Sequence, residues 1–278
     1  MSVEASTRTP LLNPGRIVSL VPSLTEALFE LGLGEKVVGV TDYCVHPARE
    51  VASRPKLGGT KNPDLAALRA LEPDLVIANQ EENKRIDIER IAASGITVWL
   101  TYPRTVADGV ALLDALTELG APEGARERVV VPVEEAFARA REMAPSQPTR
   151  VFCPIWKKPW MSVGPGTYGH DLLRLCGGLN VFGDVAEVGD RRYPIVRAEQ
   201  IEAAAPEVIL LPDEPYAFGP RDAQELAALR VPAAESGRIH LIDGTLVTWY
   251  GPRIRTAVET LRSLLDPRLD PRLGARPG

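Results

Sequence analysis

The sequence predicts an α/β fold of two lobes, each with a central, mostly parallel sheet flanked by helices, joined by one long linking helix. A pattern of helix, proline, buried strand and acidic loop occurs twice, at residues 65–82 and 198–214. Other strand-like apolar runs alternate with helical segments, as in parallel sheets that are covered on both faces. Between the two copies, residues 121–148 are charged, rich in Ala and Arg, and helical in period. Two similar halves favour a ligand-binding cleft between lobes.

Composition and charge narrow the class of protein. The chain has 278 residues, 45% of them hydrophobic and 25% charged, which is ordinary for a soluble globular protein. The net charge of -5 argues against nucleic-acid binding. No apolar run approaches the roughly 20 residues that cross a bilayer. The first ten residues lack the apolar core of a secretory signal. We therefore expect a cytoplasmic protein if this is the full gene product, and a periplasmic or cell-surface protein if a signal was removed.

The first lobe is expected at residues 15–120. Short apolar runs predict its strands, and glycines that follow the helical stretches mark the helix ends. Ser23 and Glu26 are spaced as the capping box of the first helix. Asn62 and Pro63 are typical of the N-cap and first turn of a later helix. In order, the expected strands are 16–21, 36–40, 75–78 and 96–100, and the expected helices are 23–31, 62–71, 86–94 and 106–119.

The linking helix is expected at residues 121–148, where Pro132 can kink it because proline has no N–H to donate. The second lobe is expected at 149–266, and residues 1–14 and 267–278 are expected to be flexible tails. In the second lobe the expected strands are 150–153, 208–211 and 238–242, and the expected helices are 170–175, 198–205 and 252–265.

Aromatic residues gather in the loops where a ligand is expected. Ligands of open parallel sheets bind beyond the carboxyl ends of the strands. A chain with only 5% aromatic residues places most of its Trp and Tyr in predicted loops. Flat aromatic side chains bind large apolar or π-rich ligands well, although some of these rings could instead pack the lobes. The loops at strand ends are 22–25, 42–46, 79–83, 156–160 and 243–250, and the aromatic residues are Tyr43, Trp156, Trp160, Tyr168, Tyr193, Tyr216, Trp249 and Tyr250.

A polar run, Asn79-Gln80-Glu81-Glu82-Asn83, directly follows a buried strand. Its amides and carboxylates could bind polar groups of a ligand, or a cation. Asn and acidic residues are equally typical of helix starts, so the run could instead cap the helix that begins near residue 84. The residues alone leave both interpretations open.

The cysteines and histidines give weak signals. The three cysteines have no Cys-x-x-Cys spacing and are expected to be buried free thiols. Cys44 and His46 could hold a soft metal, but they have no second pair, so we expect no metal site. No P-loop, nucleophile elbow or His-Glu-x-x-His motif occurs, and we expect no enzyme. A remote alternative is a catalytic pair drawn from Asp42, Cys44, His46, Cys153 and His170.

The order of six motifs carries a family resemblance. The motifs are Arg16-Ile-Val-Ser-Leu-Val-Pro-Ser-Leu-Thr-Glu26, Gly58-Gly-Thr60, Leu71-Glu-Pro-Asp-Leu-Val-Ile77, Ile91-Ala-Ala-Ser-Gly-Ile96, Gly177-Gly-Leu-Asn-Val-Phe182 and Trp249-Tyr-Gly-Pro-Arg253. With them the chain resembles the helical-backbone periplasmic binding proteins, or class III substrate-binding proteins, for iron-siderophore, haem and cobalamin. The resemblance covers about residues 15–265 and is closest to the cobalamin-binding branch. It implies non-catalytic binding of a large metal chelate in the cleft, with little hinge motion.

The resemblance also implies where the ligand binds. Cobalamin receptors line the cleft with tryptophans, and the matching positions here are Thr60, Asn79 and Tyr193, while Trp249 is kept. Trp156 and Trp160 are additional to the family pattern. The full set of predicted ligand-binding residues is Ser23, Tyr43, Thr60, Asn79, Gln80, Glu81, Trp156, Trp160, Tyr168, Tyr193, Trp249 and Tyr250.

The family implies an ABC importer as a possible partner, which receives one docking glutamate from each lobe. Glu199 matches the position in the second lobe, whereas the first-lobe position falls on Ala66, so one docking charge is missing. We expect a monomer that binds cobalamin or a related corrinoid as ligand and needs no other cofactor. The alternative ligand is a ferric siderophore or haem, which tyrosines or His46 could bind. Basic residues that would suit such an anionic ligand are Lys61, Lys84, Lys157, Lys158, Arg191 and Arg192.

Overall fold

A computed structural model describes residues 3–6, 8–183 and 192–266 of the chain. Its contacts divide the chain into two compact units. Each unit is assembled from separate stretches of sequence, so Tyr250 belongs with the first unit although it lies near the end of the chain. The first unit comprises Met1–Pro103, Ala107–Glu134 and Tyr250–Pro252, and the second comprises Arg104–Val106, Glu135–Trp249 and Arg253–Gly278.

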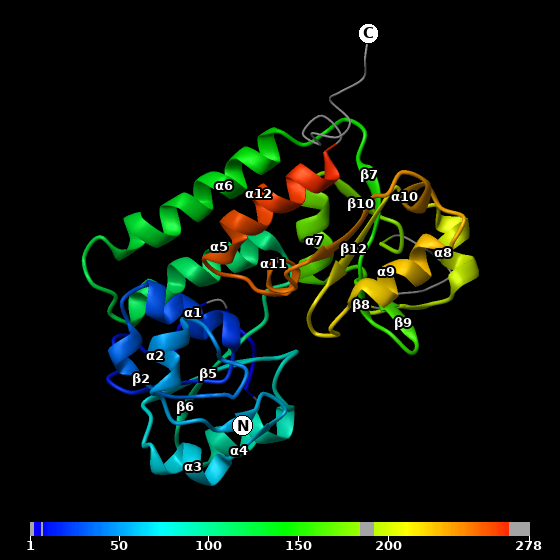
Figure 1. Cartoon of the computed structure of the whole chain (residues 1–278). Coiled ribbons are helices and arrows are strands. Elements are labelled where there is room, and N and C mark those ends of the chain that lie inside the picture. The colour runs from blue at the N-terminus through cyan, green and yellow to red at the C-terminus, as the bar shows by residue number, and fades with distance from the viewer. Residues whose placement is uncertain (1–2, 7, 184–191, 267–278) are drawn as a thin grey trace. The chain divides into compact units, whose positions relative to one another are not determined.

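The first unit is built on a parallel four-stranded sheet, as the sequence predicts. In spatial order its strands are β2 (Val37–Val40), β1 (Ile17–Ser19), β5 (Leu75–Asn79) and β6 (Thr97–Thr101). α3 (Leu65–Ala70) and α4 (Arg85–Ala93) cover one face, and α1 (Pro22–Glu30) covers the other (Figure 1). Leu68 of α3 and Ile91 of α4 pack with Val18 and Val76 of the sheet. The unit also contains α2 (Ala48–Ala52), the β3–β4 pair (Gly58–Gly59 and Asn62–Pro63), and most of α5 (Val106–Leu116).

Two of the expected helix starts in the first unit are wrong. Pro22 occupies the first turn of α1 and Val21 is its N-cap, so Ser23 lies inside the helix and the expected capping box is not formed. Asn62 and Pro63 form β4, and Asp64 caps α3 instead, accepting hydrogen bonds from Ala66 N and Ala67 N at 2.9 and 3.0 Å. In both places proline fixes the local backbone and shifts the helix start by one or two residues.

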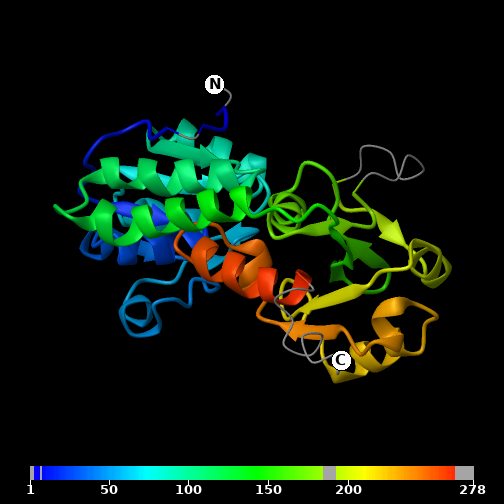
Figure 2. The same cartoon turned by 90° about the horizontal axis from the view of Figure 1, so that it is seen from above.

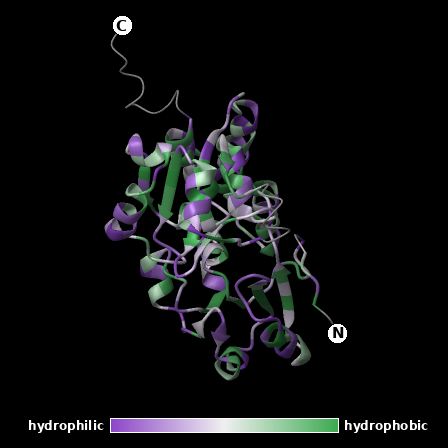
Figure 3. Ribbon diagram, turned by 90° about the vertical axis from the view of Figure 1, so that its right-hand side faces the viewer, coloured by the Kyte–Doolittle hydropathy of each residue, from purple (hydrophilic) through white to green (hydrophobic). Residues whose placement is uncertain are grey.

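The second unit repeats the architecture. Its parallel sheet has the order β10 (Gly178–Asn180), β7 (Thr149–Phe152), β12 (Val208–Pro212) and β13 (Ile239–Ile242). α8 (Ala198–Ala204), α9 (Pro220–Ala227) and α10 (Pro232–Glu235) lie on one face, and α7 (Tyr168–Leu175) and α12 (Arg253–Leu265) lie on the other (Figure 1, Figure 2). Phe152, Ile209 and Leu211 pack with apolar residues of α8 to α10. The strands of both sheets are mostly green in Figure 3, and β5 and β12 are buried along their whole length.

A small antiparallel sheet replaces one expected loop. The chain leaves β7, forms β8 (Pro154–Trp156), turns at residues 157–159 and returns as β9 (Trp160–Ser162), which also pairs with β11 (Ile195–Val196). Trp156 and Trp160 therefore lie on strands, and the expected loop 156–160 is reduced to its three middle residues. The pairing was not visible in the sequence because β11 lies more than thirty residues further along the chain.

The repeated helix–proline–strand unit has the same local structure in both copies. Glu72 and Ala205, each just before the proline, both adopt φ of 44°. This left-handed conformation, uncommon for residues other than glycine, ends each helix and turns the chain into the strand.

One arginine closes each copy in the same way. Arg16 donates from Nη2 to the Leu71 carbonyl at 2.6 Å, and its backbone N–H donates to the Asp74 carboxylate at 2.8 Å. In the second copy, Arg150 Nη2 donates to the Ala204 carbonyl at 2.5 Å, and Arg150 N donates to Glu207 Oε2 at 2.8 Å. The acidic residue after each proline therefore holds the start of the neighbouring strand, and the sequence repeat is a structural repeat.

In the sequence, the helical segment that separates the strands of the first sheet from those of the second is Arg126–Glu142. A π-helix (Arg126–Val130) leads into α6 (Val131–Glu142), whose second residue is Pro132. Because Pro132 cannot donate a backbone hydrogen bond, the turn before it widens from α to π geometry. Arg262 of α12 caps the end of α6 with hydrogen bonds to the carbonyls of Ala140 and Met143, both 3.2 Å.

Part of the N-terminal segment lies against the first sheet. Ser6 N donates to the Leu100 carbonyl at 2.8 Å and Trp99 Nε1 donates to the Ser6 carbonyl at 2.9 Å, so this part of the expected N-terminal tail lies against β6. The expected tail at 267–278 lies outside the described residues. Within the described ranges, no helix has both the length and the apolar character needed to cross a membrane.

Candidate ligand-binding site

Two buried asparagines shape the loop after β5. Asn79 Oδ1 accepts hydrogen bonds from Glu81 N at 2.7 Å and Glu82 N at 3.3 Å, while Asn83 Oδ1 accepts one from Asn79 N at 2.8 Å. Asn83 Nδ2 donates to the Thr60 carbonyl at 2.9 Å. The amides therefore fix the loop from inside. They do not cap α4, whose N-cap residue follows them and makes no side-chain cap.

Because its amides point inward, the loop presents other side chains at its surface. Gln80 is exposed, and Glu81 and Glu82 are half-buried. Lys61 donates a hydrogen bond from its ammonium to the Glu81 carbonyl. Tyr43, in the loop after β2, is 63% exposed and is open to a ligand.

Tyr250 joins this loop from the far end of the chain. Asn79 Nδ2 donates to the Tyr250 hydroxyl at 2.8 Å, and both side chains are buried. Burial raises the pKa of Tyr250 well above its usual value, and the charge of Glu82 raises it further. The hydroxyl therefore stays protonated, and the structure brings Ser23, Asn79 and Tyr250 of the predicted site together.

The cysteines are not placed for nucleophilic chemistry. Cys44 is buried among the hydroxyls of Thr25 and Thr41, at 3.1 and 3.2 Å, and burial raises its pKa. Burial alone raises the pKa of Cys153 to about 12. A cysteine nucleophile acts as the thiolate, so neither thiol supports the Cys/His enzyme alternative. In the part of the chain that the structure describes, no three His, Cys, Asp or Glu side chains are grouped so that they could hold a metal ion.

In the second unit, a continuous series of rings leads from the core to the surface. We call it the aromatic ladder: Trp156, Tyr216, Phe218, Trp160, Phe152 and Phe182. Ring centroids along it lie 5.7, 4.7, 5.7, 6.4 and 5.5 Å apart in that order. Phe218 and Trp160 stack within 3° of parallel, whereas Trp156 meets Tyr216 edge-on at 73°. Trp156 is 45% exposed, so the ladder ends in an aromatic side chain that a ligand can contact.

The hairpin that carries Trp156 is tied to α9 by one lysine. Lys157 Nζ lies 2.6 Å from Asp222 Oδ1 and 2.6 Å from Glu225 Oε2, and 5.0 Å from the centroid of the Trp160 ring. Burial on its own lowers the pKa of Lys157, but its hydrogen bonds to the two carboxylates raise the pKa overall. Burial on its own raises the pKa of Asp222, but the hydrogen bond from Lys157 lowers it overall. Both groups are therefore charged at neutral pH.

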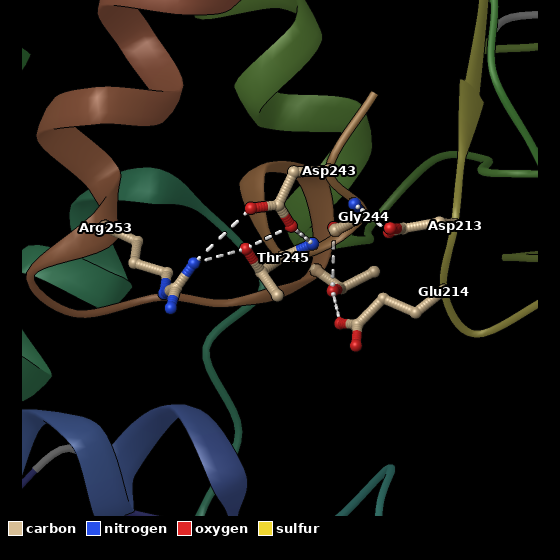
Figure 4. A network of polar contacts seen from close by, with 7 residues as sticks. Asp213, Glu214, Asp243, Gly244, Thr245 and Arg253 are labelled. Carbon is tan, nitrogen blue, oxygen red and sulfur yellow. Dashed lines mark hydrogen bonds and ion pairs between the residues drawn. The ribbon is translucent and has the colours of Figure 1, made fainter. Parts of the chain in front are cut away.

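A polar network holds the ends of β12 and β13 (Figure 4). Asp243 Oδ1 accepts from Thr245 N at 2.9 Å and from Thr245 Oγ1 at 2.6 Å, and Arg253 Nη1 donates to Thr245 Oγ1 at 2.7 Å. Asp213 Oδ1 accepts from Gly244 N at 2.7 Å. The network fixes the short α11 (Thr245–Thr248), so the expected loop 243–250 is partly helical.

The remaining predicted aromatics of the second unit are more enclosed. Trp249 is buried, with the Arg253 guanidinium 4.9 Å from its ring centroid. Tyr168 is the first residue of α7 rather than a loop residue, and burial raises the pKa of its hydroxyl. Tyr193 is half-buried beneath the Arg192 guanidinium, 5.7 Å from the ring centroid. Their roles in ligand binding stay predictions.

Sequence reasoning missed several residues of these two arrangements. Lys157 was noted only as a cation, and its partners Asp222 and Glu225 were not singled out. Their i, i+3 spacing was the only available signal, and such spacing is common on solvent-exposed helices. Phe218 was missed although it follows Tyr216 at the spacing of one strand face.

The two predicted docking positions are both at the surface. Glu199 is exposed in the first turn of α8, and Ala66 is exposed in the first turn of α3. The repeat thus places them at equivalent positions of two equivalent helices. The position in α8 carries a charge, and the position in α3 does not.

Comparisons with known proteins place this fold and these motifs. Residues 17–245 match the family described as periplasmic binding protein. A vitamin B12-binding protein of Vibrio cholerae is 27% identical over 205 residues, which are 73% of this chain and 72% of the relative. The crystal structure of a periplasmic vitamin B12 binding protein of Vibrio cholerae superposes with a TM-score of 0.77 at 24% identity, covering 91% of this chain and 96% of that one.

A second solved structure is similar to a comparable extent. The periplasmic haem-binding protein RhuT from Roseiflexus sp. RS-1, in its apo form, has a TM-score of 0.72 and 26% identity over 90% of this chain and 97% of its own. The family match spans most of the chain and agrees with the fold and with the resemblance drawn from the motifs. The chain belongs to the periplasmic binding protein family.

Proposed function

We propose that the chain binds a corrinoid, cobalamin or a close relative of it, without transforming it. The observation that carries the proposal is the exposed aromatic residue Trp156 at the end of the aromatic ladder. A large conjugated ring is a ligand that such a flat, well-supported surface suits. The 27% identity with a vitamin B12-binding protein supports the same class of ligand.

The polar loop of the first unit suits the amide side chains at the rim of a corrinoid. Gln80 offers both a donor and acceptors, and the carboxylates of Glu81 and Glu82 accept hydrogen bonds from amide N–H groups. The loop is rigid because Asn79 and Asn83 hold it from inside. A preformed surface of this kind lowers the entropy cost of binding. We propose the chelate as ligand, with no further cofactor.

Equilibrium dialysis against cyanocobalamin tests binding and turnover together. We expect saturable uptake of one ligand per chain, and we expect the ligand released by denaturation to have an unchanged absorption spectrum and mass. A ligand recovered in altered form would point to an enzyme, and no uptake at protein concentrations of about 100 μM would rule out affinities of biological use.

Haem is the second candidate ligand, because the Roseiflexus protein that shares this fold at 26% identity is haem-binding. An anionic ligand needs cations, and three of the basic side chains near the strand ends are engaged elsewhere. Lys157 is paired with two carboxylates, Lys61 bonds to a backbone carbonyl, and Lys84 bonds to Asn62 Oδ1 at 2.5 Å. Arg191 lies outside the described residues. This charge distribution favours a neutral or cationic chelate.

We also propose that the protein works outside the cytoplasm and delivers its ligand to an ABC importer. The family description supports the location, and the exposed Glu199 supports the contact. Release of the protein by osmotic shock tests the location, since a cytoplasmic protein stays in the shocked cells. Corrinoid uptake by cells that carry Glu199→Arg tests the contact, and we expect reduced uptake with unchanged ligand affinity of the purified protein.

A further inference from the structure

We infer that Lys157 is a positioning residue, which holds the β8–β9 hairpin on α9 and so fixes the ring of Trp156 that meets the ligand. The inference rests on the proposed function for its ligand, but its geometric part stands on contacts within the second unit. It concerns a residue that the sequence suggested only as a charge for anionic ligands.

Lys157 is the link between three elements. Its backbone lies at the turn of the hairpin, directly after Trp156, and its ammonium reaches both Asp222 and Glu225 of α9 at 2.6 Å. The ammonium also lies 5.0 Å from the centroid of the Trp160 ring on the returning strand. One side chain therefore joins both strands of the hairpin to the helix.

The partners of Lys157 are themselves fixed. Asp222 is 13% exposed at its side chain, and its second oxygen accepts a hydrogen bond from Gly219 N at 2.9 Å, which closes the first turn of α9. The Trp160 ring stacks on Phe218, which belongs to the core of the unit. Lys157 pairs with the buried carboxylate of Asp222 and lies against the packed ring of Trp160. These two contacts restrict the conformation of its side chain.

The Trp156 ring is supported by Tyr216. Its ring meets Tyr216 edge-on at 5.7 Å, and almost half of its surface is open. Its strand is three residues long, and β8 and β9 pair with a register shift between Pro154 and Trp156. β8 is an end strand of the small sheet β11–β9–β8, so Trp156 lies on the strand with pairing on one side. The Lys157 contacts therefore add a restraint to this short, irregular pairing.

The charges explain why lysine suits the position without attracting anions. Its ammonium is paired with the carboxylates of Asp222 and Glu225, so it is not available to bind an anionic ligand.

The test compares the Lys157→Met variant, which keeps an apolar stem but loses the charge, with Lys157→Arg, which keeps the charge. Glu225→Gln removes one exposed partner and serves as a milder variant if Lys157→Met folds poorly. The matched control is Arg126→Met, because Arg126 also bonds two carboxylates, Asp114 at 2.7 Å and Glu134 at 2.6 Å, in the other unit.

The first readout needs no ligand. Acrylamide quenching of Trp156 is obtained as the difference between each protein and the same protein with Trp156→Phe. We expect a larger quenching constant in Lys157→Met and Glu225→Gln, and a wild-type value in Lys157→Arg and Arg126→Met. Unchanged quenching of Trp156 in Lys157→Met overturns the inference, whatever the protein binds.

The second readout is the Kd for cyanocobalamin. We expect Lys157→Met to raise Kd about tenfold, with Lys157→Arg restoring it. If Trp156 loosens but wild-type protein binds no corrinoid, the proposed ligand is wrong and the positioning of Trp156 by Lys157 stands. If Trp156 loosens and Lys157→Met binds cyanocobalamin as tightly as wild type, Lys157 does not position Trp156 for the ligand and the inference fails.

Discussion

The side-chain amide of Asn79 donates a 2.8 Å hydrogen bond to the hydroxyl of Tyr250, although 171 residues separate them in the sequence. The same amide group accepts from two backbone N–H groups of the loop that follows β5. A single asparagine therefore connects the end of β5, the polar loop that follows it and the segment at Tyr250 within the first unit.

Replacing Asn79 with Ala should lower the free energy of unfolding by about 2–4 kcal/mol, because it leaves buried N–H and hydroxyl groups without partners. Chemical denaturation measures the loss. Gln80→Ala is the matched control, since Gln80 is exposed beside it and should change stability by less than about 0.5 kcal/mol. Equal stability of the two variants would contradict the role given to Asn79.

Trp156→Ala should weaken corrinoid binding about tenfold or more while leaving the melting temperature close to that of wild type. The ring lies at the exposed end of the aromatic ladder, so its removal takes away ligand contact and little core packing. Calorimetric titration gives the affinity and differential scanning calorimetry gives the stability. Met143→Ala is the control, because Met143 is similarly exposed at the end of α6. An unchanged Kd for Trp156→Ala removes the observation on which the proposed function rests.

Gly244→Ala should destabilise the second unit by about 1–3 kcal/mol, the usual range for an atom forced into a packed site. A Cβ at this position would lie 2.6 Å from Glu214 N and 2.8 Å from Glu214 O, both backbone atoms that cannot swing away. Gly219→Ala is the control, since a Cβ there meets nothing within 4 Å. Thermal unfolding of both variants checks the difference, which should vanish if the β12 and β13 ends are loosely held.

The Lys157–Asp222 pair should stabilise the second unit across the neutral range and fail at both extremes of pH. The raised pKa of Lys157 keeps its contribution complete below about 10.5, and the contribution is lost as pH rises above that value. The lowered pKa of Asp222 keeps its contribution complete above about 3.8, and the contribution is lost as pH falls below it. A double-mutant cycle with Lys157→Met and Asp222→Asn, repeated across pH, should give a coupling that is constant between these limits. A coupling that changes near neutral pH would show that another group controls the pair.

The fold was predictable from the sequence because its signals are local. The sequence copies at 65–82 and 198–214 predicted two similar units. The structure adds that Arg16 and Arg150 make the same hydrogen bond to the end of the helix in each copy. Helix starts were less predictable where proline intervened. Asn62 has the residue type of an N-cap, but Asp64 fills the role because the preceding residues pair as a strand.

The candidate site was predictable in its residue types and not in its geometry. The strand-end pattern pointed to Asn79 and Trp156 as candidates, but the residues that contact them come from other parts of the chain. Tyr250 reaches Asn79, and Tyr216 supports Trp156, through contacts that no local pattern encodes. The predicted aromatic residues also differ in exposure: Trp249 is buried, whereas Trp156 is exposed. This difference depends on tertiary packing and could not be read from the sequence.

The most direct test of the account is isothermal calorimetry of the purified protein with cyanocobalamin, with haem as a parallel titrant. We expect saturable corrinoid binding with a Kd in the micromolar range or below, and haem binding weaker by at least about tenfold, because Lys61, Lys84 and Lys157 are engaged within the protein. Haem bound as tightly as the corrinoid, or haem bound and no corrinoid, would contradict it.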